Sequence, residues 1–141
     1  MKAVRFHKTG GPEVLVYEDV PDPTPKDGEV LIKVEAAGLN FSDVMRRRGD
    51  DYPEPSPTPF ILGVEVAGTV AAVGNGVTSI AVGTPVLATP GAGGYAQYIS
   101  VPCGHGRTAS AWYYCGTGGG RGGARTDRGP LAAQRRATGS R

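Results

Sequence analysis

The stretch Glu29–Gly49, EVLIKVEAAGLNFSDVMRRRG, carries the two patterns on which the predicted fold depends. In its first part, Glu29–Ala37, every second residue is apolar and points to one face of an extended chain: Val30, Ile32, Val34 and Ala36. Lys33 and Glu35 point to the other face. This period of two predicts a half-buried strand with one face in water.

A short helix is predicted directly after this strand. Asn40 or Ser42 can cap its start, and Asp43 favours the positive end of the helix dipole. Three arginines at positions 46–48 follow in the last turn, and Gly49 supplies the C-terminal stop. We interpret the arginines as a solvated face, because a charge run at a helix end usually is one.

Further strands are expected on both sides of this stretch: Lys2–Phe6, Val14–Val20, Phe60–Val73, Thr84–Thr89 and Tyr95–Pro102. The loop Asp50–Pro59 contains four prolines and should be extended. Gly63 and Gly68 interrupt one of the strands, where glycines mark bulges, bends or close backbone approach. Many short strands joined by Gly/Pro turns predict a mainly β sandwich or small barrel.

The composition changes at Cys103. Residues 1–102 carry 8 Lys+Arg and 12 Asp+Glu, a net charge of −4, whereas residues 103–141 carry 7 Arg and one Asp, a net charge of +6. The second part also has ten glycines and no Val, Ile, Phe or Met. It cannot bury enough apolar surface to offset the entropy of ordering. We therefore predict a folded domain over 1–102 and a disordered tail over 103–141.

Other global features point to a cytoplasmic chain. Cys103 and Cys115 have neither the number for a disulfide framework nor metal-ligand spacing. The N-terminus lacks the apolar core of a signal peptide, and no apolar run is as long as a membrane span.

The tail contains a glycine motif that matches G-x-G-x-x-G at Gly118, Gly120 and Gly123. A working dinucleotide loop needs a strand before it, a helix at its third glycine and an acidic residue about twenty positions on. Here Gly129-Pro130 interrupts any helix, and the chain has no position twenty past Gly123. We predict that these glycines do not bind a cofactor.

Five ordered blocks of residues 1–102 resemble the zinc-independent quinone oxidoreductases of the medium-chain dehydrogenase/reductase superfamily: MKAVRFHKTGGPEVL, EVLIKVEAAGLNFSDVMRRRG, PFILGVEVAGTVAAVGNGV, VGTPVLA and GGYAQYISVP. The resemblance implies a partly open, chaperonin-10-like β-barrel with one or two short helices. In that family a Rossmann-type domain follows, binds NADPH and often forms the dimer. Hydride passes from NADPH to a quinone or an α,β-unsaturated carbonyl compound. No βαβ pattern follows Pro102, so the cofactor domain is expected to be missing.

The resemblance also implies three site residues. Asn40 and Asp43 match the family's N-x-x-D motif, which places Asn40 beside the nicotinamide, where its amide can donate to a substrate carbonyl oxygen. Asp43 would orient Asn40 or a water. Tyr52 matches a tyrosine over the mouth of the active site, but Met45 stands where the family often has a second tyrosine. The alternatives are a plain N-cap for Asn40, a dipole partner for Asp43 and an exposed loop aromatic for Tyr52.

No zinc site is expected. Zinc-dependent relatives have a histidine ligand where Val64 stands and a cysteine near the position of Asn40, and valine or an amide cannot replace them. Val64 is therefore expected to be a buried strand residue.

Three interpretations of the whole chain remain open. The leading one is a truncated NADPH-dependent, zinc-free reductase of a small quinone or enone, with a tail read out of frame. The second is a non-catalytic barrel whose basic tail binds RNA or another polyanion. The third is a subunit that a separate Rossmann chain completes.

Overall fold

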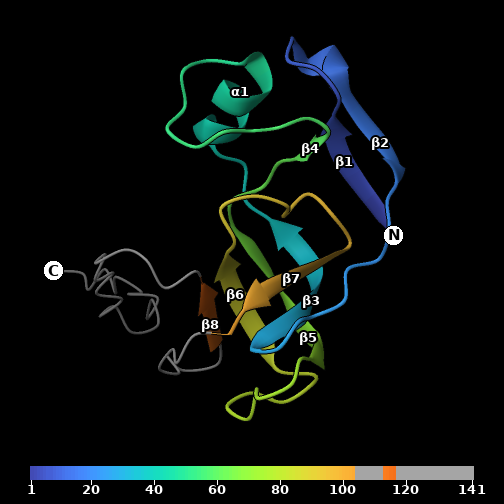
Figure 1. Ribbon diagram of the computed structural model, residues 1–141, viewed down its shortest axis with the longest axis vertical. Coiled ribbons are helices and arrows are strands. Elements are labelled where there is room, and N and C mark those ends of the chain that lie inside the picture. Colours follow the sequence, from blue (N-terminus) through green and yellow to red (C-terminus); the bar gives the residue numbers. More distant parts are fainter. Residues whose placement is uncertain (104–112, 117–141) are drawn as a thin grey trace, which may run out of the picture.

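The computed structural model describes residues 1–103 and 113–116. It is mainly β, as predicted, and its strands form two sheets with the orders β2-β1-β4 and β7-β3-β5-β6-β8. The strands are β1 (Lys2–Phe6), β2 (Leu15–Asp19), β3 (Glu29–Ala37), β4 (Phe60–Ile61), β5 (Val66–Val73), β6 (Pro85–Thr89), β7 (Tyr98–Pro102) and β8 (Tyr113–Gly116). The helices are the 3-10 turn Pro12–Val14 and α1 (Phe41–Arg48). The smaller sheet and α1 lie together at one end, and the larger sheet curls at the other (Figure 1).

Strand β3 lies at the centre of the larger sheet, as its alternating sequence suggests. It pairs antiparallel with β5 on one side and with β7 on the other. Val30 and Ile32 are completely buried, whereas Ala36 on the same predicted face is exposed. Register shifts along the β3–β5 pair turn the end of the strand away from the core. The core itself gathers the inward side chains of all the antiparallel strands of this sheet and of one loop residue: Val30, Ile32, Val66, Val70, Ile80, Val86, Ala88, Ile99 and Val101.

The predicted strand Phe60–Val73 divides into β4 and β5 at its first glycine. Gly63 has φ +96°, a left-handed conformation that strains any residue with a side chain. Val64 follows in the bend between the two strands and is half-buried, so the expectation of a buried strand residue there is wrong. The second glycine, Gly68, lies in β5, and a Cβ at this position would be 2.0 Å from the carbonyl oxygen of Lys33. It marks the close backbone approach that the sequence suggested.

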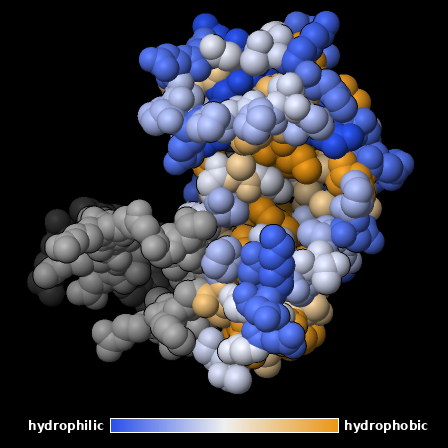
Figure 2. Space-filling model, viewed as in Figure 1, coloured by the Kyte–Doolittle hydropathy of each residue, from blue (hydrophilic) through white to orange (hydrophobic). Residues whose placement is uncertain are grey.

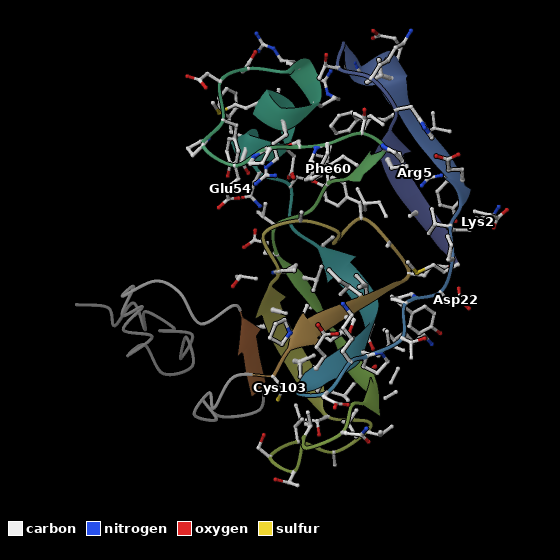
Figure 3. All side chains as sticks on the ribbon, viewed as in Figure 1. Lys2, Arg5, Asp22, Glu54, Phe60 and Cys103 are labelled. Carbon is white, nitrogen blue, oxygen red and sulfur yellow. The ribbon has the colours of Figure 1, made fainter. Side chains whose placement is uncertain are left out.

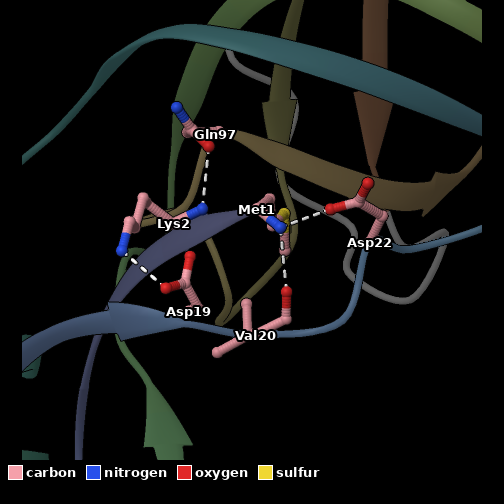
Figure 4. Close-up of polar contacts among 6 residues, drawn as sticks. All are labelled: Met1, Lys2, Asp19, Val20, Asp22 and Gln97. Carbon is pink, nitrogen blue, oxygen red and sulfur yellow. Dashed lines mark hydrogen bonds and ion pairs between the residues drawn. The ribbon is translucent and has the colours of Figure 1, made fainter.

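The two sheets are joined at the start of the chain (Figure 4). The Met1 ammonium donates to the Val20 carbonyl oxygen at 2.9 Å and pairs with the Asp22 carboxylate. The Lys2 N–H donates to Gln97 Oε1 at 2.7 Å, and Gln97 N–H donates back to the Lys2 carbonyl oxygen at 3.1 Å. The two bonds between Lys2 and Gln97, with the bridge between Ala3 and Ala96, connect β1 to the segment that leads into β7.

Helix α1 begins and ends where the sequence predicted, but its arginines do not form a solvated face. Arg46 and Arg47 are only 4% and 8% exposed, and Arg48 alone of the three faces water. Arg47 exchanges two hydrogen bonds with Gly10, since its guanidinium donates to the Gly10 carbonyl and its own carbonyl accepts from the Gly10 N–H. Contacts with other parts of the chain therefore bury Arg46 and Arg47, although a run of charges at a helix end usually faces water. Within the described residues, no helix is long and apolar enough to cross a membrane.

Strand β8 departs from the prediction of a tail without structure. Its four residues pair in parallel with β6, in the register Val86–Tyr113 to Thr89–Gly116. The first two, Tyr113 and Tyr114, belong to the one bulky cluster of the tail, Trp112-Tyr113-Tyr114, and the strand extends the edge of the larger sheet. The rest of the predicted tail after Cys103 lies outside the described residues.

We predict that Gly68→Ala destabilises the domain by about 2–3 kcal/mol, because β3 and β5 must separate to admit the methyl group. The control is Ala71→Val, an enlargement at an exposed position of the same strand, which should change the free energy of unfolding by less than about 0.5 kcal/mol. Urea unfolding of both variants measures the difference. Equal effects would mean that the close approach at Gly68 does not limit the side chain.

Candidate active site

The carboxylate of Asp43 lies at the start of α1 and connects three parts of the chain. The residue is 5% exposed. Its Oδ1 accepts a hydrogen bond from the Gly63 N–H at 3.0 Å. Its Oδ2 accepts from the Asn40 N–H at 3.0 Å and from the Tyr95 hydroxyl at 2.8 Å. Asp43 thus joins the loop between β3 and α1, the bend before β5 and the segment before β7.

Tyr95 is the partner that no local pattern could identify. It lies 52 residues from Asp43 in the sequence, and its hydroxyl also approaches the Gly38 carbonyl oxygen at 3.3 Å. Burial, together with the hydrogen bond to the Asp43 carboxylate, raises the pKa of Tyr95 well above its usual value. The phenol therefore stays protonated and acts as a hydrogen-bond donor at physiological pH.

Asn40 occupies the N-cap position of α1. Its backbone N–H is bonded to Asp43, as the acidic residue of a capping box requires. Its side chain has a second partner, because Nδ2 donates to Glu65 Oε1 at 3.1 Å. An amide nitrogen carries two hydrogens, and the other one makes no hydrogen bond to the described residues. It is free to donate to a ligand.

Glu65 was not predicted as a site residue, although it stands in the quoted block beside Val64. Its side chain lies over Gly38, where a Cβ would be 2.1 Å from Glu65 Oε1. The two residues are also bonded through the backbone, from the Gly38 N–H to the Glu65 carbonyl oxygen at 3.0 Å. A glycine at position 38 therefore leaves the space through which Glu65 reaches Asn40.

Bare apolar side chains flank Asn40 on both sides in the sequence. Leu39 is 87% exposed and Phe41 is 70% exposed. Hydrophobic side chains also gather in the middle of the face shown in Figure 2, between the part that carries α1 and the larger sheet. Exposed apolar surface beside a free amide donor is typical of a site that another molecule or domain covers.

Tyr52 lies at the other end of α1, away from Asn40 and Asp43. Its ring packs on the Arg46 guanidinium, whose Cζ is 4.2 Å from the ring centroid. The same guanidinium lies 5.3 Å from the Phe60 ring and bonds Glu54 at 2.5 Å and Ser56 at 3.2 Å. Figure 3 shows Glu54 on the loop that follows α1 and Phe60 at the start of β4, into which this loop leads. Asn40 and Arg46 are about 9 Å apart along the helix axis.

Tyr52 also lines an open pocket of about 460 Å³. The other lining residues come from the last turn of α1, the loop after it and the turn after β1: Thr9, Arg46, Gly49, Asp50, Asp51, Glu54, Pro55 and Ser56. Asn40 and Asp43 are not among them. The structure therefore brings two of the three predicted site residues together and places the third beside a neighbouring pocket.

Two further predictions concern a zinc site and the glycine motif of the tail. In residues 1–103 and 113–116, no three His, Cys, Asp or Glu side chains are placed to hold a metal ion; the absence of zinc stays a prediction. Gly118, Gly120 and Gly123 lie outside the described residues.

Comparison with known proteins identifies the same family as the resemblance in the sequence. The family model of the alcohol dehydrogenase GroES-like domain matches residues 26–127 and so extends past Pro102. Pig quinone oxidoreductase is 45% identical over 100 residues, which cover 70% of this chain and 30% of that protein. Because GroES is a chaperonin-10, the match confirms the chaperonin-10-like barrel.

Solved structures of quinone oxidoreductases are also similar to this chain. A mycobacterial quinone oxidoreductase is 46% identical with a TM-score of 0.63, covering 72% of this chain and 31% of that one. The quinone oxidoreductase of Escherichia coli complexed with NADPH is 34% identical with a TM-score of 0.67, covering 72% and 31%. The chain thus spans about a third of the length of these relatives.

We predict that Tyr95→Phe lowers the free energy of unfolding by about 1.5–2.5 kcal/mol, because Asp43 loses one charge-assisted hydrogen bond inside the domain. Tyr17→Phe is the matched control, since Tyr17 is 66% exposed and its ring is kept; it should cost less than about 0.5 kcal/mol. Urea unfolding compares the two. A Tyr95→Phe variant as stable as the control would remove Tyr95 from the network.

We predict that Arg46→Lys costs about 1–2 kcal/mol, because an ammonium cannot bond Glu54 and Ser56 together while it stacks on two rings. Arg48→Lys is the control: this side chain is 54% exposed and its Nε lies 3.6 Å from Asp50, so the change should be less than about 0.5 kcal/mol. Thermal unfolding followed by circular dichroism distinguishes the two arginines. Similar losses would show that Arg46 is held no more firmly than a surface charge.

Proposed function

Because this chain belongs to the alcohol dehydrogenase GroES-like domain family, we propose that it is the substrate-side domain of an oxidoreductase that reduces a quinone or an α,β-unsaturated carbonyl compound with NADPH. The observation that carries this proposal is the Asn40 amide. It stands at the N-terminus of α1 with one N–H free, and its two neighbours in the sequence, Leu39 and Phe41, have exposed side chains. The names of the matched relatives, which are quinone oxidoreductases, support the same reaction class.

The residues present fit the nicotinamide end of NADPH. A planar, largely apolar ring can cover exposed apolar side chains such as Leu39 and Phe41, the two sequence neighbours of Asn40, whose amide has one free N–H. When bound, NADPH supplies the hydride. Asn40 donates its hydrogen bond to the carbonyl oxygen of the substrate as that oxygen gains negative charge, which lowers the barrier only if the donor is already oriented.

Asp43 serves this reaction as a positioning residue. Its carboxylate is fully engaged with the Asn40 and Gly63 backbone and with Tyr95, so its task is to hold the N-terminus of α1 in place. Tyr52, at the far end of the helix, belongs in this proposal to the mouth of the site. Its ring contacts substrate in the pocket beside Arg46 before or after the hydride step.

The reaction is proposed for a protein that also has a cofactor domain, since the chain spans only about a third of its relatives. We place the domain boundary near Pro102, and we propose that the cofactor domain belongs either to a longer form of the protein or to a separate Rossmann chain. A cytoplasmic location and zinc-free chemistry belong to the same proposal. The alternative of an RNA-binding tail rests on residues outside the described part, and no observation favours it.

Two proteins test the proposal: this chain, and a longer protein in which a Rossmann domain follows Pro102. The short chain should not bind NADPH at micromolar concentration, because the sequence around its glycine motif lacks the strand–turn–helix pattern that a dinucleotide loop needs, and ordering a loop costs about 1–2 kcal/mol per residue. The long protein should bind NADPH and reduce a quinone. NADPH fluorescence and absorbance follow binding and turnover.

In the long protein, Asn40→Ala should lower kcat about 100-fold, the usual effect of removing one donor to a developing oxyanion. Asn75→Ala is the control, because Asn75 makes an exposed bond to Asp27 in a turn far from α1 along the chain. An Asn40→Ala protein with unchanged kcat would refute the role of the amide. If the short chain bound NADPH at micromolar concentration and Gly118→Val abolished this binding, the proposal that NADPH binds to a separate cofactor domain would be refuted.

A further inference from the structure

We propose that Glu65 is a positioning residue that fixes the orientation of the Asn40 amide. Its Oε1 accepts one of the two Nδ2 hydrogens at 3.1 Å. Because the two N–H bonds of an amide nitrogen diverge in one plane, this bond turns the other N–H away from Glu65. The inference rests on the proposed function, since it says why that second hydrogen is available to a substrate oxygen.

Glu65 can act in this way because its own position is fixed from two sides. Its backbone carbonyl accepts the Gly38 N–H at 3.0 Å. Its side chain crosses the open α-carbon of Gly38, where a Cβ would lie 2.5 Å from its Cγ and 2.1 Å from its Oε1. Gly38 has no left-handed φ that would itself demand glycine. The space over Gly38 therefore serves the Glu65 side chain.

The backbone of Asn40 is held independently, by the bond from its N–H to the Asp43 carboxylate. The Asp43 carboxylate bonds the Asn40 backbone, and within the capping box the Asp43 backbone meets the Asn40 side chain, but neither contact holds the amide nitrogen. A partly exposed amide whose nitrogen has no partner samples a wider range of side-chain torsions. Glu65 restricts this range, so the two acidic residues have separate tasks: Asp43 places Asn40 at the start of the helix, and Glu65 holds the nitrogen of its amide.

The 141-residue chain itself permits a direct test by NMR. In the wild type, the ¹⁵N order parameter of the Asn40 side-chain amide should be close to that of the rigid backbone, about 0.85. In Glu65→Ala it should fall below about 0.6, the value of a flexible group. Gly38→Ala should have the same effect, because its methyl group displaces the carboxylate and leaves the charge in the protein. Glu65→Gln should retain most of the order, since its amide oxygen can still accept the bond.

Glu35→Gln is the matched control. Glu35 is an exposed carboxylate on β3 that also accepts a side-chain hydrogen bond, from Thr69 Oγ1 at 3.2 Å, and this variant should leave the Asn40 amide unchanged. An Asn40 order parameter that stays at the wild-type value in both Glu65→Ala and Gly38→Ala would overturn the proposal. This result does not depend on NADPH, so it is distinct from a failure of the proposed function.

Kinetics in the longer protein then test whether the orientation matters. Glu65→Ala should lower kcat about tenfold with KM nearly unchanged, and Glu65→Gln should restore most of the loss. If Glu65 acts through Asn40, the double variant Asn40→Ala/Glu65→Ala should be no slower than Asn40→Ala alone. Additive losses in the double variant would overturn the positioning role even if Asn40 itself proves catalytic.

Discussion

The fold around the candidate site depends on one buried carboxylate. Asp43 accepts hydrogen bonds from the Asn40 N–H, the Gly63 N–H and the Tyr95 hydroxyl, and each donor belongs to a different segment of the barrel. A carboxylate in the interior is costly unless its oxygens are bonded. The network therefore requires all three segments to meet at one point, and this requirement fixes where α1 starts relative to the sheet.

The same constraint explains why the site can be precise on a small domain. The loop between β3 and α1, the Gly63 bend and the segment before β7 are irregular, and irregular backbone is normally mobile. Here they share one acceptor group, so none can shift without the others. Glu65 bonds the side chain of Asn40 next to this network, and the sequence neighbours of Asn40, Leu39 and Phe41, are exposed apolar residues. The Asp43 network holds the backbone of Asn40, and the surface beside Asn40 is exposed. This combination suits a residue that must hold one hydrogen-bond donor toward a partner domain.

Local signals in the sequence predicted much of this arrangement. The alternation of Glu29–Ala37 gave β3 its bounds, and Asn40, Asp43 and Gly49 marked the ends of α1 because capping chemistry is local. Long-range partners could not be predicted in this way. Tyr95 is far from Asp43 in the sequence, and Arg46 is buried only because Tyr52, Glu54 and Phe60 close around it. Strand β8 depends on the open edge of β6, which composition alone does not reveal.

Native-state hydrogen exchange in Asp43→Ala tests the central role of this carboxylate most directly. If Asp43 holds the three segments together, the backbone amides of Asn40 and Gly63 should both exchange at least about tenfold faster than in the wild type, as expected for the loss of a charge-assisted hydrogen bond. The amides of Ile32 and Val86, in the core of the larger sheet, should keep their protection and show that the domain is folded. If the Asn40 and Gly63 amides exchange at wild-type rates while the core is intact, the carboxylate does not organise the site.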